Sequence, residues 1–166
     1  MTERLPWTRA IETRLHVAPA RFAVYGHLGG VVAKEFYDEE EEAWERARLL
    51  AGRSGRPALV VLLSSGSAWV VQGGGSRLVR AEEPFPRLHL SLPAMADLTN
   101  RGSARLLRRG PLPALGRVYE PRSTVYFALR VLSGRLLARV VALEEADEGV
   151  WVHLYAARWG DGPWWG

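Results

Sequence analysis

The sequence predicts an α+β fold: an antiparallel sheet of about five strands with two main helices, preceded by an N-terminal β-hairpin. Two helical segments alternate with groups of short strand-like segments, and the last third reads as three consecutive strands. The strands are joined by tight turns rather than by crossover helices, which favours antiparallel pairing. With 48% hydrophobic and 24% charged residues, the 166-residue chain has the composition of an ordinary globular protein.

The first elements are a hairpin and a helix. Arg21 to Phe36 predicts the hairpin, because apolar residues alternate with polar or small ones on either side of Gly29 and Gly30. Asp38 is the expected N-cap of the helix, and the acidic residues that follow it suit a helix start. The apolar residues of this helix recur at three- and four-residue spacing: Ala43, Trp44, Ala47, Leu50 and Ala51.

Three strands are expected next, at residues 58–63, 68–71 and 77–80. The three glycines at 73–75 lie between the second and third of them. A phosphate-binding loop would need a lysine after its last glycine and a helix to follow, and neither is present. The glycines therefore predict a hairpin turn.

The second helix is predicted from Pro93 to Arg109, with Gly110 and Pro111 ending it. A connector with a short extended piece at residues 117–120 follows. The last third predicts strands at 124–132, 135–144 and 150–158, the first two joined by the turn Ser133-Gly134.

No residue pattern indicates catalysis, a metal or a cofactor. The chain has no cysteine, and its four histidines lack the short spacings of metal ligands. The serines at 64, 65 and 67 lack the surroundings of a nucleophile elbow. The acidic clusters at 38–42 and 144–148 fit a helix start and a hairpin loop without a bound cation. We expect a protein that is not an enzyme and that needs no cofactor.

The charge is basic and unevenly distributed. The formal net charge is +4, with 21 arginines and a single lysine, Lys34. Residues 98–141 contain nine arginines and one acidic residue. No apolar run is long enough to cross a bilayer, and no signal peptide is visible. We expect a cytoplasmic bacterial protein without a membrane partner.

The three C-terminal strands predict a sheet with two different faces. Pairing across the Ser133-Gly134 turn gives a core face that includes Ala138, Val140 and Ala142. The opposite face interleaves arginine with aromatic residues, which suits binding of single-stranded nucleic acid unless the second helix covers it. The residues of this predicted platform are Tyr126, Arg130, Arg139, Trp151, His153 and Tyr155.

A second candidate surface lies on the second helix. Arg101, Arg105 and Arg108 recur at helical spacing and predict a basic stripe. Such a stripe fits an acidic protein surface or phosphates, and it also fits a helix face that is merely solvated.

The segment 94–155 resembles the Roadblock family of dynein-light-chain-like regulators, which have a profilin-like α+β fold. The likeness is carried by the helix AMADLTNRGSARLLRRG, the connector GRVYEPRSTVYFALRVL, the turn SG and the strands RLLARVVALEE and GVWVHLYAAR. The resemblance implies an N-terminal extension at 1–36, a roadblock-like domain at 37–159 and a Trp-rich tail at 160–166. It also implies a homodimer that regulates a Ras-like small GTPase. The residues implied for partner binding are Asn100, Arg101, Arg105, Arg108 and Arg109.

Overall fold

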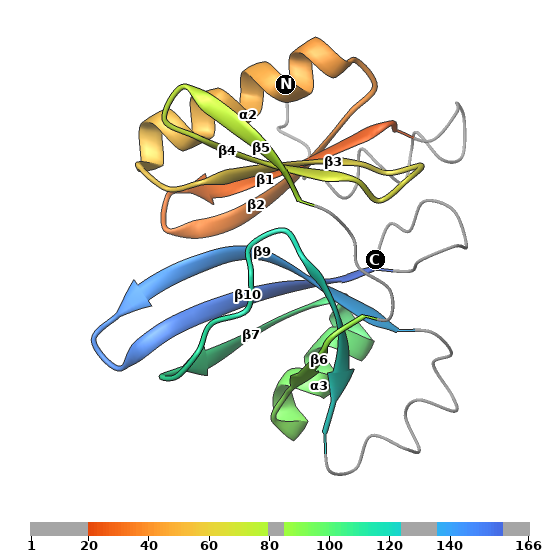
Figure 1. Ribbon diagram of the computed structural model, residues 1–166, viewed down its shortest axis with the longest axis vertical. Helices are drawn as coiled ribbons and strands as arrows, with labels where there is room; N and C mark the ends of the chain where they lie inside the picture. The colour runs from red at the N-terminus through yellow and green to blue at the C-terminus, as the bar shows by residue number, and fades with distance from the viewer. Residues whose placement is uncertain (1–19, 80–84, 124–135, 158–166) are drawn as a thin grey trace, which may run out of the picture. The chain divides into compact units, whose positions relative to one another are not determined.

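The computed structural model describes residues 20–79, 85–123 and 136–157, which fall into two compact units. Unit 1 contains the described residues up to Val79, and unit 2 contains those from Phe85 onward. Each unit has one five-stranded sheet and one helix in its described part (Figure 1). The predicted α+β class, the five-stranded antiparallel sheet, the two helices and the N-terminal hairpin are confirmed. The two helices belong to different sheets rather than sharing one.

Unit 1 is an antiparallel sheet with the strand order β2-β1-β3-β4-β5. Gly29 and Gly30 turn the β1–β2 hairpin with φ values of 58° and 81°, which glycine adopts without strain. β1 also pairs with β3, so the hairpin belongs to the sheet, and the expected domain boundary after residue 36 lies inside unit 1. The elements are β1 (Phe22–Leu28), β2 (Val31–Tyr37), α2 (Glu40–Ser54), β3 (Ala58–Leu62), β4 (Ala68–Gln72) and β5 (Gly75–Val79).

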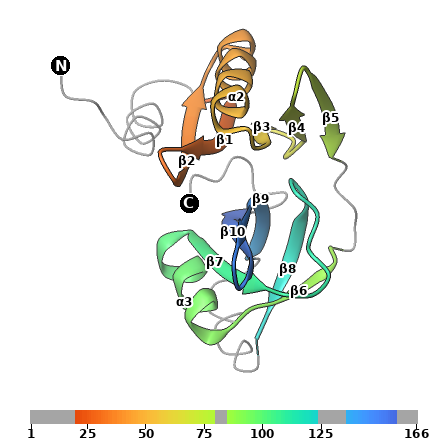
Figure 2. The ribbon, with the colours of Figure 1, turned by 90° about the vertical axis from the view of Figure 1, so that its left-hand side faces the viewer.

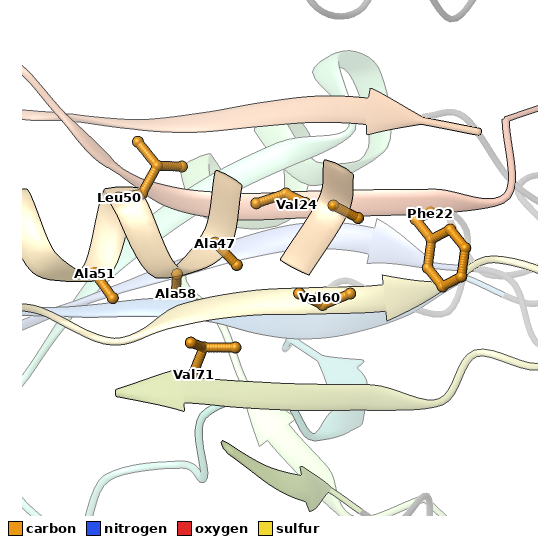
Figure 3. Close-up of a cluster of buried hydrophobic side chains, with 9 residues drawn as sticks. Phe22, Val24, Ala47, Leu50, Ala51, Ala58, Val60 and Val71 are labelled. Carbon is orange, nitrogen blue, oxygen red and sulfur yellow. The ribbon is translucent and has the colours of Figure 1, made fainter. Parts of the chain in front are cut away.

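The core of unit 1 lies between α2 and one face of this sheet (Figure 3). Leu50 is 1% exposed and sits over Gly26, where an added Cβ would lie 2.8 Å from Leu50 Cδ1. Glycine at position 26 therefore allows the helix to approach β1 closely. The buried members of the cluster are Phe22, Val24, Ala43, Ala47, Leu50, Ala51, Ala58, Val60 and Val71.

The N-cap of α2 differs from the prediction. Glu39, rather than Asp38, holds the N-cap position, with extended backbone and no side-chain capping bond. The prediction from Asp38 assumed a capping hydrogen bond, which the helix start does not use. Glu40, Glu41 and Glu42 occupy the first turn, where the positive end of the helix dipole stabilises their negative charge.

The other face of the unit 1 sheet is buried as well. Leu59 and Ala23 are 0% exposed, and Lys34 is only 8% exposed. The Lys34 ammonium lies 5.0 Å from the centroid of the Phe36 ring and 5.8 Å from that of Tyr25. Burial lowers the pKa of Lys34 from 10.5 to about 8, because the charged form loses its hydration.

Unit 2 has the strand order β6-β8-β9-β10-β7. β6 runs parallel to β8, and the other neighbours are antiparallel. α3 packs mainly against β7 (Figure 2). β8 matches the expected extended piece, whereas β6 lies outside the predicted strands. The elements are β6 (Arg87–His89), α3 (Leu92–Arg101), β7 (Ser103–Arg108), β8 (Val118–Arg122), β9 (Leu137–Ala146) and β10 (Gly149–Ala157).

The predicted helix from Pro93 to Arg109 is wrong in its second half. α3 ends at Arg101, because Gly102 adopts the left-handed conformation with φ 76° and donates its N–H to Leu98 O. Residues 103–108 then form β7, which pairs with β10. Tertiary pairing here overrides the helix preference of a segment rich in arginine and leucine.

The last two predicted strands are confirmed as β9 and β10, joined by a tight turn in which Gly149 pairs with Ala146. The predicted strand at 124–132, the Ser133-Gly134 turn and the tail at 160–166 lie outside the described residues. No helix in the described part of the chain is long and apolar enough to span a membrane.

Candidate functional site

Charged and aromatic side chains from β7, β9 and β10 lie together on one face of the unit 2 sheet. Residues that pair across antiparallel strands point to the same face. On β10, Tyr155 pairs with Arg139, and His153 pairs with Arg105. We call this surface the arginine–aromatic face; its members are Arg105, Arg139, Glu144, Trp151, His153 and Tyr155.

The opposite face of β10 is core. Val152 and Leu154 are 0% exposed, and Ala156 is 6% exposed. Trp151, His153 and Tyr155 alternate with them and are half-buried. The predicted two-sided character of this strand is therefore present.

A β-bulge in β9 changes one predicted position. Between His153 and Leu154 the pairing partner moves from Ala142 to Val140, so Val141 is the extra residue. Ala142 consequently lies on the arginine–aromatic face, and its predicted place on the core face beside Val140 is wrong. The bulge allows Arg139 and Glu144, five positions apart, to share one face.

Arg105 and Trp151 form the most exposed contact of the face. The Arg105 guanidinium carbon lies 4.5 Å from the centroid of the Trp151 ring. Trp151 pairs with Leu107, so Arg105 is its diagonal neighbour on β7. Arg105 is exposed, and a guanidinium held over an indole is stabilised by the negative face of the ring.

His153 and Glu144 lie beside this contact. His153 Nε2 is 3.8 Å from Glu144 Oε1, with side chains 17% and 22% exposed. The carboxylate attracts the imidazole when the ring is protonated. Glu144 pairs with Trp151 in the sheet, so the indole, the imidazole and the carboxylate are neighbours.

Arg139 and Tyr155 form the more enclosed part of the face. Arg139 is 6% exposed, and its Nη1 donates to Gly116 O at 2.6 Å. This guanidinium is therefore engaged with the backbone of the protein. Burial raises the pKa of Tyr155, because the phenolate form would lose its hydration.

The five residues implied for partner binding do not form one stripe. Asn100 and Arg101 end α3, whereas Arg105 and Arg108 lie on β7. Arg108 pairs with Val150 and points away from the arginine–aromatic face. Arg109 Nε donates to Glu148 O at 2.9 Å. The spacing that predicted a stripe holds only for a helix, and this segment is a strand.

Sequence reasoning placed Arg139, Trp151, His153 and Tyr155 on one face, and the structure brings these four together. Tyr126 and Arg130 lie outside the described residues. Sequence reasoning missed Glu144 and assigned Arg105 to a different surface. Gly102 was the sequence signal that could have placed Arg105 outside the helix, because this glycine ends α3.

Comparison with protein-family models, with curated proteins and with solved structures finds no match to this chain. Among the described residues, no group of three or more His, Cys, Asp or Glu side chains is placed to hold a metal ion.

Proposed function

We propose that the protein is a non-enzymatic binding module that recognises single-stranded nucleic acid through the arginine–aromatic face. The observation that carries this proposal is the exposed Arg105 guanidinium held 4.5 Å from the Trp151 ring centroid. Such a guanidinium offers a flat cationic surface on which a base can stack, and its outer N–H groups can donate to a phosphate.

Further features support the same partner. His153 and Tyr155 continue the row of rings along β10. Arg101 and Arg109, both exposed, flank the two ends of β7 and add positive charge beside the face. Cations around stacking rings are the usual means of binding single strands without strong sequence preference.

Fluorescence anisotropy of a labelled oligothymidine tests the proposal. We expect binding that weakens steeply with salt, because bound phosphates release counterions. Arg105→Gln should weaken binding about tenfold, since it removes both the charge and the stacking surface. Arg101→Gln is the matched control: it removes an exposed charge that lies outside the face, so it should weaken binding less than Arg105→Gln.

No binding at low salt would contradict the proposal. Equal losses in the Arg105 and Arg101 variants would also contradict it, because they would indicate attraction by overall charge rather than by the face.

A second candidate function follows from the family resemblance: a homodimeric regulator of a Ras-like small GTPase. It is supported by the exposed Asn100, Arg101 and Arg109 beside β7, the outermost strand at this end of the described sheet. An edge strand leaves backbone groups that a second copy can pair with. Light scattering should then give a dimer mass, and a cognate GTPase should form a complex whose GTP turnover changes. A monomer that leaves the turnover unaltered would exclude this candidate.

A further inference from the structure

Unit 1 contains a cleft that the proposed function does not use. Its volume is about 250 Å³, and it lies beside α2 and the turn between β4 and β5. Ala51 and Val71, labelled in Figure 3, come from the two sides of this cleft. The lining residues are Trp44, Arg48, Ala51, Gly52, Val71, Gly73, Gly74, Gly75 and Ser76.

The size and lining of the cleft suit a small ring system. Ligand pockets usually measure about 300–1,000 Å³, so this cleft fits one or two fused rings rather than a nucleotide. Ala51 and Val71 are buried apolar residues. The Trp44 ring stands edge-on to Trp69, with centroids 5.7 Å apart and planes at 63°, and this contact fixes one wall.

Glycines form part of the cleft lining. A Cβ added at Gly52, Gly73 or Gly74 would meet no atom within 4 Å. Gly73 has φ 62° and begins the two-residue turn that joins β4 to β5. The space beside these three positions is therefore open.

The charge of the cleft is positive. Trp44, Arg48 and Gly52 recur every four residues and so share one face of α2. Arg48 is exposed and has no hydrogen-bond or ion-pair partner among the described residues. Arg46, by contrast, is held by Glu35 at 2.6 Å. No acidic residue lines the cleft, so an anion would meet no like charge there.

We propose that this cleft binds a small planar aromatic carboxylate, with its ring against Trp44 and its carboxylate on the Arg48 guanidinium. One guanidinium matches one carboxylate through two parallel hydrogen bonds. The apolar floor and the single cation favour this ligand over a phosphate, whose higher charge requires more donors. The site is independent of the arginine–aromatic face.

Titration of the ¹⁵N-labelled full-length protein with 2-naphthoate, followed by NMR, tests the proposal. We expect saturable shifts of the Gly73, Gly74 and Gly75 amides and of the Trp44 indole N–H. The uncharged 2-naphthamide should bind about tenfold more weakly or worse, because it cannot form a charged pair with the guanidinium.

Three variants locate the binding. Arg48→Gln should weaken naphthoate binding about tenfold by removing the cation. Gly52→Leu should abolish binding by filling the cleft, while its spectrum stays that of a folded protein. Arg53→Gln, the matched control, removes an exposed cation of α2 outside the lining and should leave binding unchanged.

Several results would overturn the proposal. They are the absence of saturable shifts up to the solubility limit of naphthoate, shifts confined to residues outside the cleft, and equal affinity for acid and amide. A loss in Arg53→Gln as large as that in Arg48→Gln would also overturn it, because the attraction would then be a general effect of charge.

Discussion

The two sheets differ in how they use their second face. In unit 1, the neighbouring residues Leu59 and Val60 point to opposite faces of β3, and both are 0% exposed. In unit 2, the residues of β10 alternate between full burial, as in Leu154, and half-burial, as in His153 and Tyr155. A strand buried on both sides contributes only to packing, whereas an alternating strand keeps one side for polar and aromatic groups. The candidate face therefore lies in unit 2.

The largest expected effect tests the double burial in unit 1. Leu59→Ala should lower the free energy of unfolding by about 3 kcal/mol, because it removes a fully buried side chain and leaves a cavity. Leu50→Ala, on the helix side, should cost a similar amount. Urea denaturation measures both, with the exposed Leu49→Ala as the control. A cost for Leu59→Ala as small as that for Leu49→Ala would show that only one face is packed.

The burial of Lys34 on the same face makes the stability of the protein depend on pH. Because the pKa of Lys34 falls from 10.5 to about 8 on folding, the unfolded chain binds more protons between these two values. Stability should therefore rise with pH across this window. Below about pH 8 both states are protonated, and the full cost of burying the charge, about 3 kcal/mol before any offset by Phe36, is present.

Lys34→Met checks this expectation, because it keeps the length of the side chain and removes the charge. The variant should be more stable than the wild type at about pH 7, by about 2 kcal/mol, and the gap should narrow by about pH 9.5. Urea denaturation at both pH values gives the two gaps. Parallel pH profiles for the two proteins would contradict the assigned burial.

Within the arginine–aromatic face, two arginines should differ in their effect on stability. Arg139→Gln should cost about 2 kcal/mol, because the buried Gly116 carbonyl loses a charged donor. Arg105→Gln should cost about 1 kcal/mol or less, since an exposed cation–π contact is weak. Thermal and urea unfolding measure the loss of stability in each variant. Equal losses would contradict the division of the face into an enclosed part around Arg139 and an accessible part around Arg105.

A smaller effect is expected at the junction of α3 and β7. Gly102→Ala should cost about 1 kcal/mol, because alanine is strained at a φ of 76°. Gly110→Ala, at an exposed glycine outside the two elements, is the comparison. A gain in helix content by circular dichroism would indicate that residues 103–109 can continue the helix, as their composition favours.

Local sequence patterns were sufficient to predict much of the fold. The hairpin predicted at 21–36 is observed as β1 and β2, and α2 was recognised from its apolar spacing and its glutamates. The turn at Gly73 and Gly74 and the strands β9 and β10 were also recognised. In these cases the residues that decide the structure are adjacent in the chain.

The failures concern interactions between distant segments. Residues 103–108 become a strand because they pair with β10, more than forty positions away, and no local residue encodes that partner. The bulge at Val141 and the assignment of each helix to its own sheet are likewise set by pairing. Four residues of the arginine–aromatic face could be predicted from the alternation of side chains along β9 and β10. Arg105 could not, because its place on the face depends on the pairing of β7 with β10.

The proposed nucleic-acid-binding face thus depends most on the position of Arg105 in β7, and cross-strand NOEs test this position directly. With β7 paired to β10, backbone NOEs should connect Arg105 with His153 and Leu107 with Trp151, and side-chain NOEs should connect Arg105 to the Trp151 ring. An uninterrupted series of helical NOEs from α3 through Arg109, without contacts to β10, would contradict the pairing of β7 with β10 and the place of Arg105 on the face.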